Sequence, residues 1–382
     1  GAQPGAPHVV SSQDFNGGEP NLGGPIEEKA AFNNPPYAYG IVERTFSEYK
    51  SSPLHSMPVS GFNSLPDDLK VPGGSLEVTY QAALGAGQGG DYADGTTRTF
   101  SCQSCHMRPT TGAGCDKNGV PIRGDLPRHD HTGGNYWFAS MSQYQDAAGT
   151  LRMGDGLSSF QLLAMDLGQE RATTHLSQAG SLEVSGNSVK VTNLTGHKLI
   201  TGYPEGRRMW LRIEWKDNAG ETIYIDGDYG SIDVDLDGDN VPESTVESII
   251  DLSGSNTKIY EAKYAMTKEW ADTLLAVGYD ANMALDYDRN TGAVVNTLGD
   301  LAGMDPGNYV ETFHFALNNY VSKDNRIPPY QMSYDTAKKR NALPNPETQF
   351  GNPGPGGVYD HWDTVDLNPP AGAVSATIEL LY

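Results

Sequence analysis

The chain has 382 residues, which is long enough for two or three domains. Hydrophobic residues make up 37% of it, and 45 glycines with 24 prolines indicate compact regions separated by irregular chain. A net charge of −22 argues against binding to nucleic acid or to anionic membranes and favours basic partners. No apolar run reaches the roughly 18 residues of a transmembrane helix, so the sequence predicts no membrane span.

Residues 1–35 are rich in Gly, Pro and Asn and show no hydrophobic periodicity. We therefore expect an extended N-terminal arm that is ordered only by docking on another surface. Residues 36–180 are interpreted as one region of helices and loops, with a short helix over residues 75–86. His55, in the loop SSPLHSMP, is either an ordinary loop histidine or an axial ligand of a metal held elsewhere.

The segment TFSCQSCHMRP (residues 99–109) carries the strongest chemical signal in the sequence. Cys102, Cys105 and His106 form a C-x-x-C-H motif, which is typical of covalent haem c attachment. Each cysteine then forms a thioether to the haem, and the histidine is the proximal iron ligand. A redox C-x-x-C pair would need a βαβ context, and a closed zinc site would need four ligands; the sequence predicts neither.

A second group of histidines follows in LPRHDHTGGNYWF, where His129 and His131 are two residues apart. A haem iron with both axial positions filled needs a second ligand, and His129 is the first candidate, against a solvated loop histidine. Cys115 is left over from the motif and is expected to be buried. Because haem c is attached after export, we expect that a leader has been removed and that the protein acts outside the cytoplasm, in the periplasm or at the cell surface.

A longer helix is predicted to begin at Ser158, where Ser158 and Gln161 form a capping-box pair, and to end near Gly180. His175 on this helix is interpreted as structural. From residue 181 to 382 the sequence predicts short strands separated by polar turns, typical of an antiparallel β-sandwich-like domain. They include a hairpin over residues 209–227, with its turn at residues 218–220, and a single strand over residues 311–321. One helix, over residues 266–277, is expected as an insertion. The fold class is therefore α+β.

The loop DVDLDGD offers separate chemistry, because acidic residues alternate around Gly238 as at the start of a calcium-binding loop. Glu243 and Glu247 lie nearby, but the closing acid of such a loop is displaced. The alternatives are a calcium site and a solvated acidic turn. The four candidate calcium ligands are Asp233, Asp235, Asp237 and Asp239.

Several blocks together resemble multihaem c-type cytochromes of respiratory bacteria. TGHKLITGYPEGRRMW resembles their TGHK-x-x-TGYPEGRRMW block, CQSCHMRP with LPRHDHTGGNYW resembles their haem site and histidine loop, and FHFALNNYVSKDNRIPPY resembles a further recurrent block. The resemblance covers most of the chain from about residue 42 to 382. Such proteins usually have several C-x-x-C-H sites and this chain has one, so it is either a single-haem offshoot or a piece of a longer protein.

The resemblance implies haem attachment at Cys102, Cys105 and His106, with His129 as the distal ligand and His197, of the TGHK block, as the alternative. For His197 the other interpretation is a hydrogen-bonded histidine at the start of a strand. Its neighbours Lys198, Arg207 and Arg208 are further candidates for pairing with haem propionates.

These features predict an electron-transfer cytochrome with one bis-histidine haem that exchanges electrons with a redox protein or with other copies of itself. One alternative is a haem enzyme or ligand sensor with an open sixth iron position, in which His131 or His197 would line the pocket. Another is a structural subunit of an extracellular assembly, such as a homo-oligomer or filament. The sequence shows no G-x-S-x-G element and no phosphate loop, which argues against hydrolase or nucleotide chemistry.

Overall fold

The computed structural model describes residues 13–15, 20–25, 44–152, 156–252 and 257–382. The expected N-terminal arm lies mostly outside these ranges; within it the structure describes two antiparallel strands, β1 (Gln13–Phe15) and β2 (Pro20–Pro25). The remaining described chain mixes helices with antiparallel sheets, which confirms the predicted α+β class. None of the described helices is both long and apolar enough to cross a membrane.

Contacts along the chain separate two compact units. The central unit comprises residues 52–181 and 191–196, and the β unit comprises residues 1–51, 182–190 and 197–382. The hairpin of β5 (Gly180–Ser185) and β6 (Ser188–Asn193) contains residues of both units. The C-x-x-C-H motif and the histidine loop lie in the central unit, and the TGHK block begins the last part of the β unit.

The central unit begins with three short 3-10 turns, η1 (Pro53–His55), η2 (Val59–Ser64) and η3 (Asp67–Leu69). Helix α2 (Ser75–Gly85) then agrees with the helix predicted over residues 75–86 and buries Leu76, Thr79 and Ala83. After η4 (Gln88–Gly90) comes α3 (Cys102–His106), which contacts α2. The motif cysteines and histidine therefore lie on a short helix supported by a longer one.

The segment after Pro109 differs from the expected loop. It forms a hairpin of β3 (Pro109–Ala113) and β4 (Ile122–Pro127). Most of its side chains are exposed, so the sequence has no alternation of apolar and polar residues that would predict strands. Backbone pairing holds the hairpin, with an ion pair of 2.8 Å between Arg123 Nε and Asp125 Oδ1 on β4.

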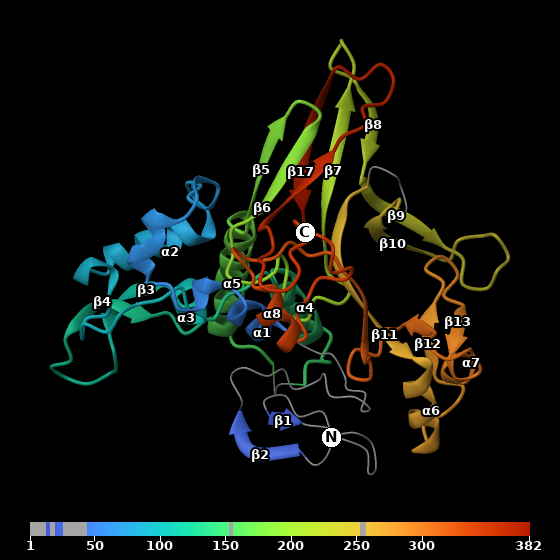
Figure 1. Ribbon diagram of the computed structural model, residues 1–382, viewed down its shortest axis with the longest axis horizontal. Coiled ribbons are helices and arrows are strands. Elements are labelled where there is room, and N and C mark those ends of the chain that lie inside the picture. The colour runs from blue at the N-terminus through green and yellow to red at the C-terminus, as the bar shows by residue number, and fades with distance from the viewer. Residues whose placement is uncertain (1–12, 16–19, 26–43, 153–155, 253–256) are drawn as a thin grey trace. The chain divides into compact units, whose positions relative to one another are not determined.

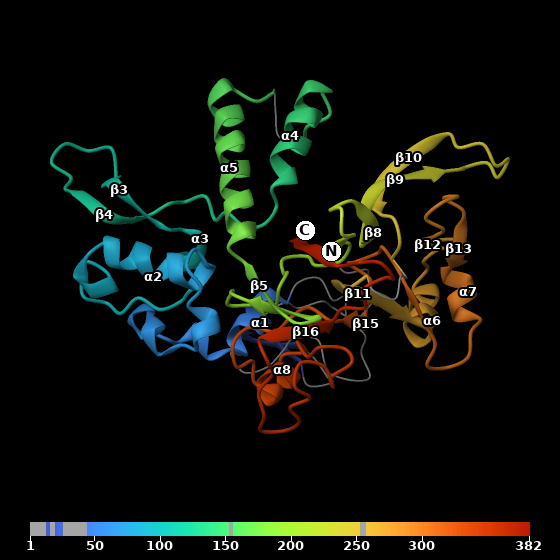
Figure 2. The same cartoon turned by 90° about the horizontal axis from the view of Figure 1, so that it is seen from above.

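The last two helices of the central unit are α4 (Trp137–Ala147) and α5 (Ser159–Ser177), which lie side by side (Figure 2). The predicted capping box is present: Ser158 Oγ accepts from the Gln161 amide, and Gln161 Oε1 accepts from the Ser158 amide. The α4–α5 contact is polar, with Gln143 donating to Asp166 at 2.7 Å.

The β unit is built around a six-stranded antiparallel sheet (Figure 1). Its path runs β14 (Tyr309–Glu311), β11 (Ile259–Thr267), β7 (Arg208–Lys216) and β17 (Ser375–Leu381), with β8 (Thr222–Asp226) beside β7 and β15 (Tyr320–Asp324) beside β11. Strand β7 is mostly buried, and its alternate residues Met209, Leu211 and Ile213 have almost no exposed surface. The predicted hairpin of residues 209–227 is confirmed.

The single strand expected over residues 311–321 is wrong, because β14 and β15 are separated by a closed turn. In this turn Thr312 Oγ1 donates to Asn318 Oδ1 at 2.7 Å, and Asn318 Nδ2 donates back to the Thr312 carbonyl at 3.1 Å. The two buried side chains satisfy each other and so stabilise the bend.

Among its described residues, the β unit also contains two hairpins, one further strand and four helices. Helix α6 agrees with the predicted insertion, and Trp270 and Leu274 of α6 pack with Leu298 and Leu301 of α7 in a buried cluster. The elements are α1 (Thr45–Lys50), β9 (Tyr229–Val234), β10 (Ser244–Ile249), α6 (Lys268–Ala276), β12 (Ala284–Tyr287), β13 (Val294–Thr297), α7 (Leu298–Ala302), α8 (Tyr334–Lys339) and β16 (Trp362–Asp366).

Candidate haem-attachment site

The C-x-x-C-H motif occupies one short turn of helix. The Ser101 side chain caps α3 by accepting from the Ser104 amide at 3.2 Å. Residues three and four apart in a helix share a face, so Cys102 projects on the same side as Cys105 and His106. No disulfide involves these cysteines, since Cys102, Cys105 and the distant Cys115 are all free thiols.

The two motif cysteines differ in their surroundings. Cys102 is exposed, whereas Cys105 is half-buried with Thr79 Oγ1 of α2 at 3.6 Å from its sulfur. Burial raises the pKa of the Cys105 thiol, and the Thr79 hydroxyl partly opposes this. One thioether position is therefore at the surface and the other is backed by α2. Cys115 is exposed, so its predicted burial is wrong: it lies in the open turn between β3 and β4.

His106 is oriented by a hydrogen bond from its ring to the chain. Its Nδ1 lies 2.5 Å from the carbonyl oxygen of Thr132, in the loop before α4. A carbonyl only accepts, so Nδ1 carries the proton and the lone pair of the neutral ring is on Nε2. Metal-bound histidines are usually held in this way, with the second ring nitrogen donating to a backbone carbonyl or carboxylate.

Two further histidine rings pack against His106. The His175 ring, from the last turn of α5, is parallel to it at 8° with 5.5 Å between ring centroids, and the His131 ring is tilted by 31° at 5.7 Å. Burial, with the nearby Arg108 cation, lowers the pKa of His175 to about 4, so this ring is neutral at pH 7. This contact could not be predicted from the sequence, because His175 and His106 are distant along the chain and α5 has no metal-binding motif.

The residues predicted as distal ligands lie in different places. His129 is exposed in the loop between β4 and α4, two residues from His131. His197 belongs to the β unit, where its Nδ1 lies 3.0 Å from the Lys198 carbonyl oxygen. His55, at the end of η1, has its Nδ1 at 2.6 Å from the Ser52 carbonyl oxygen. The structure thus brings His131 and His175, rather than His129, to the ring of His106.

The propionate role considered for Lys198 is wrong, because this side chain is fully buried within the β unit. Its Nζ is paired with Asp324 Oδ2 at 2.6 Å. Arg208 is also engaged, with its Nε 2.8 Å from Glu261 Oε2. Both cations therefore have partners in their own unit.

A small cavity of about 110 Å³ opens beside the His106 ring. It is lined by His106 and the stacked His175, with three arginines, one carboxylate and one hydroxyl. These side chains come from α3, from α5 and from the segments that follow α3 and β4. These residues are His106, Arg108, Arg128, Asp130, Arg171, Thr174 and His175. All of them belong to the central unit.

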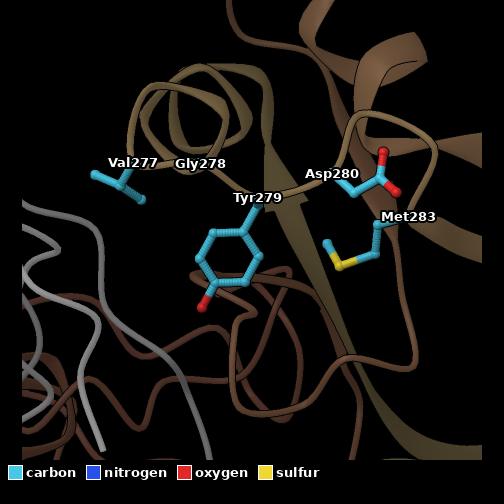
Figure 3. Close-up of a pocket in the computed structure, with 5 residues that line it drawn as sticks. All are labelled: Val277, Gly278, Tyr279, Asp280 and Met283. Atoms are coloured by element: carbon cyan, nitrogen blue, oxygen red, sulfur yellow. The ribbon is translucent and has the colours of Figure 1, made fainter.

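This donor set fits covalent haem attachment. Two thiols and an imidazole nitrogen share one helical turn, and the hydrogen bond to Thr132 leaves the lone pair of His106 on the outer ring nitrogen. A larger hollow of about 470 Å³ is found in the β unit (Figure 3), lined by Val277, Gly278, Tyr279, Asp280 and Met283. Its lining residues include no cysteine for covalent haem attachment and no histidine.

The predicted calcium loop forms a carboxylate cluster that differs from the expected set by one residue. One carboxylate oxygen from each of Asp235, Asp237, Asp239 and Glu243 lies within 4.8 Å of the others. Asp233 is outside this group among the described residues; it lies on β9 opposite Thr245 of β10. Backbone amides also donate to the cluster, for example Gly238 to Asp235 at 2.7 Å. Calcium binding stays a prediction.

Comparison with known proteins finds little similarity to this chain. No family model matches the chain, and no curated protein matches it. A penta-heme cytochrome c552 from Thermochromatium tepidum is a weak structural match, with 15% identity over 48% of this chain and a TM-score of 0.16. The match spans 38% of that protein's length, and a likeness this low carries no argument about this chain.

Proposed function

We propose that this protein is a c-type cytochrome that acts outside the cytoplasm and carries one electron on a single haem attached to Cys102 and Cys105. The observation that carries the proposal is the arrangement of α3. There, both cysteines and His106 share one turn, and the Nδ1 proton of His106 is bound to the Thr132 carbonyl. The extracytoplasmic location is proposed because haem c is attached after export.

The bound haem supplies a one-electron couple between ferric and ferrous iron. In this proposal His106 is the proximal ligand, and Thr132 and the stacked His175 ring fix the orientation of its imidazole. His129 and His197 stay as the candidates for the second axial ligand, and the contact between His131 and His106 adds His131 to them. Two histidine ligands leave no vacant iron position, which suits electron transfer with little rearrangement.

The test is the visible spectrum of the purified protein, oxidised and reduced, with and without carbon monoxide. The proposal expects a low-spin spectrum that carbon monoxide does not change. A prompt shift on adding carbon monoxide would contradict the electron-transfer proposal and indicate an enzyme or sensor with an open iron position. Substituting His129, His131 and His197 one at a time by Ala identifies the second ligand, because loss of that residue alone converts the spectrum to high spin.

A further inference from the structure

The cavity beside His106 concentrates positive charge in an otherwise acidic protein. Three guanidinium groups, of Arg108, Arg128 and Arg171, face it against the single carboxylate of Asp130, which is an excess of two positive charges. The whole chain carries a net charge of −22. Such a local excess favours an anionic group with about two negative charges.

Arg108 has hydrogen-bonding capacity that the described chain does not use. Its Nη2 donates to Gln178 Oε1 at 2.7 Å, but its Nε is buried and has no hydrogen-bond partner among the described residues. A buried donor left unpaired costs about 1–3 kcal/mol, so an acceptor at this position would be stabilising.

The other two arginines differ in their freedom to bind a ligand. Arg171 Nε lies 2.5 Å from Asp130 Oδ2 and 3.4 Å from Thr132 Oγ1, so this cation is already held in place. Arg128 is exposed at the edge of the cavity, at the end of β4. The cavity thus combines Arg171, which is already ion-paired, with Arg108, whose Nε has no hydrogen-bond partner among the described residues, and with the exposed Arg128.

The size and donor geometry indicate carboxylates as the ligand class. A volume of about 110 Å³ is small, which suits carboxylate groups. The planar fork of arginine binds carboxylates through two parallel hydrogen bonds. Because His106 lines the cavity, a haem bound to His106 would have its own carboxylates nearby.

We propose that the two propionate groups of the haem are bound at this cavity by Arg108 and Arg128, with Arg171 as a third, fixed cation. This inference rests on the proposed function and deepens it, because it assigns the edge of the haem that faces the cavity. Positive charge near the iron favours the reduced state, which has one positive charge fewer. The three arginines therefore raise the reduction potential of the haem.

The experiment compares Arg108→Gln, Arg128→Gln and a control, Arg123→Gln, in the haem-loaded protein. Arg123 lies in the same unit on β4 but pairs with Asp125 and does not line the cavity. Two quantities are measured: the reduction potential by spectroelectrochemistry, and the propionate bending bands by resonance Raman spectroscopy. Arg128 is exposed, so its variant tests the proposal even if Arg108→Gln does not fold.

We expect both cavity variants to shift the reduction potential downward and to shift the propionate bands, while Arg123→Gln changes neither. Compared with Arg108→Gln, Arg108→Lys should have a reduction potential closer to that of the unsubstituted protein, because it keeps the positive charge. Its propionate bands should stay shifted, because lysine lacks the planar guanidinium group. Unchanged potential and bands in Arg108→Gln and Arg128→Gln, with the haem attached, would overturn this inference and leave the proposed function intact. Lack of covalent haem in the unsubstituted protein would overturn both.

Discussion

Glu205, in the loop before β7, is a carboxyl group whose two oxygens have unequal surroundings. Its Oε1 accepts from Asn318 Nδ2 at 3.0 Å, whereas its Oε2 is buried without a hydrogen-bond partner among the described residues. Burial raises the pKa of Glu205 to about 7, and the hydrogen bond from Asn318 only partly opposes this. The folded protein therefore prefers the protonated form well above the pH at which the unfolded chain ionises.

The expected consequence is a loss of stability with rising pH. The stability that protonated Glu205 contributes is fully present below about pH 4.5, which is the pKa of this carboxyl group in the unfolded chain. It is lost as the pH rises through about 7, the pKa of the group in the folded protein. Glu205→Gln, which stays neutral, should be more stable than the unsubstituted protein by about 1–2 kcal/mol at pH 8, allowing for partial solvent screening, with the gap closing by pH 5. Urea denaturation at both pH values measures this. The exposed Glu221→Gln is the control, and parallel profiles for Glu205→Gln and the unsubstituted protein would show that Glu205 does not ionise in this window.

Residues with a local relation in the sequence could be predicted as part of the site, and residues brought together by packing could not. Cys102, Cys105 and His106 can be identified from the sequence because their relation is local, within one turn of helix. The contact of His175 with His106 depends on how α5 packs, and no spacing in the sequence encodes it. For the same reason the buried ion pair of Lys198 could not be predicted.

At the scale of elements, a buried group of charges joins α1 to the loop after β15. Arg326 Nη2 lies 2.8 Å from Glu48 Oε1 of α1 and 2.7 Å from Asp324 Oδ2, and its Nη1 donates to the Ile200 carbonyl at 2.7 Å. Burial alone would raise the pKa of Asp324, but Arg326 and Lys198 outweigh it and hold that pKa below its ordinary value. The four charges of Glu48, Lys198, Asp324 and Arg326 balance, so the group is stable only when complete.

Removing one member should therefore be strongly destabilising. We expect Arg326→Met to lower the free energy of unfolding by about 3–5 kcal/mol, because it leaves the buried Glu48 carboxylate without its cation and Asp324 with Lys198 alone. Lys263→Met is the matched control. Its ion pair with Glu311, at 3.1 Å, is partly exposed on both sides and should contribute about 1 kcal/mol or less. Denaturant unfolding compares the two, and equal losses in both variants would argue against a special role for the buried group.

Helices α2 and α5 of the central unit differ in how deeply their leucine side chains are buried. Leu163 of α5 is 54% exposed, whereas Leu76 of α2 is 1% exposed. Leu76→Ala should lower the free energy of unfolding by about 2–5 kcal/mol. Leu163→Ala should change it by no more than about 0.5 kcal/mol, because little of the Leu163 side chain is buried. Thermal unfolding of the two variants measures this difference. A large loss on substituting Leu163 would mean that another surface covers α5 in solution.

Elements with strong local signals could be predicted, and those without could not. The capping box of Ser158 and Gln161 predicts the start of α5, and the polar turn at residues 218–220 predicts the hairpin of β7 and β8. The hairpin of β3 and β4 has mostly exposed side chains and so lacks the pattern that predicts a strand. The break between β14 and β15 depends on the hydrogen bonds of Thr312 with Asn318, which local propensity does not encode.

At the scale of the whole molecule, the net charge of −22 should govern encounters with redox partners. Electron exchange with a cationic complex such as hexaammineruthenium should slow as salt is added, because screening removes the attraction. Exchange with anionic ferrocyanide should become faster. Stopped-flow rates at about 0.01 M and 0.1 M salt test this, over a range in which the screening length falls from about 30 Å to 10 Å. The same salt response for both reagents would show that net charge does not control the encounter.

Covalent haem attachment is tested by the intact mass of the denatured protein, produced in a host that attaches haem c. We expect the mass of the polypeptide plus one haem, with loss of that haem when Cys102 and Cys105 are both replaced by Ser. Cys115→Ser, at the exposed cysteine outside the motif, should keep the haem. A mass equal to the polypeptide alone, or haem lost on denaturing the unsubstituted protein, would contradict the central claim.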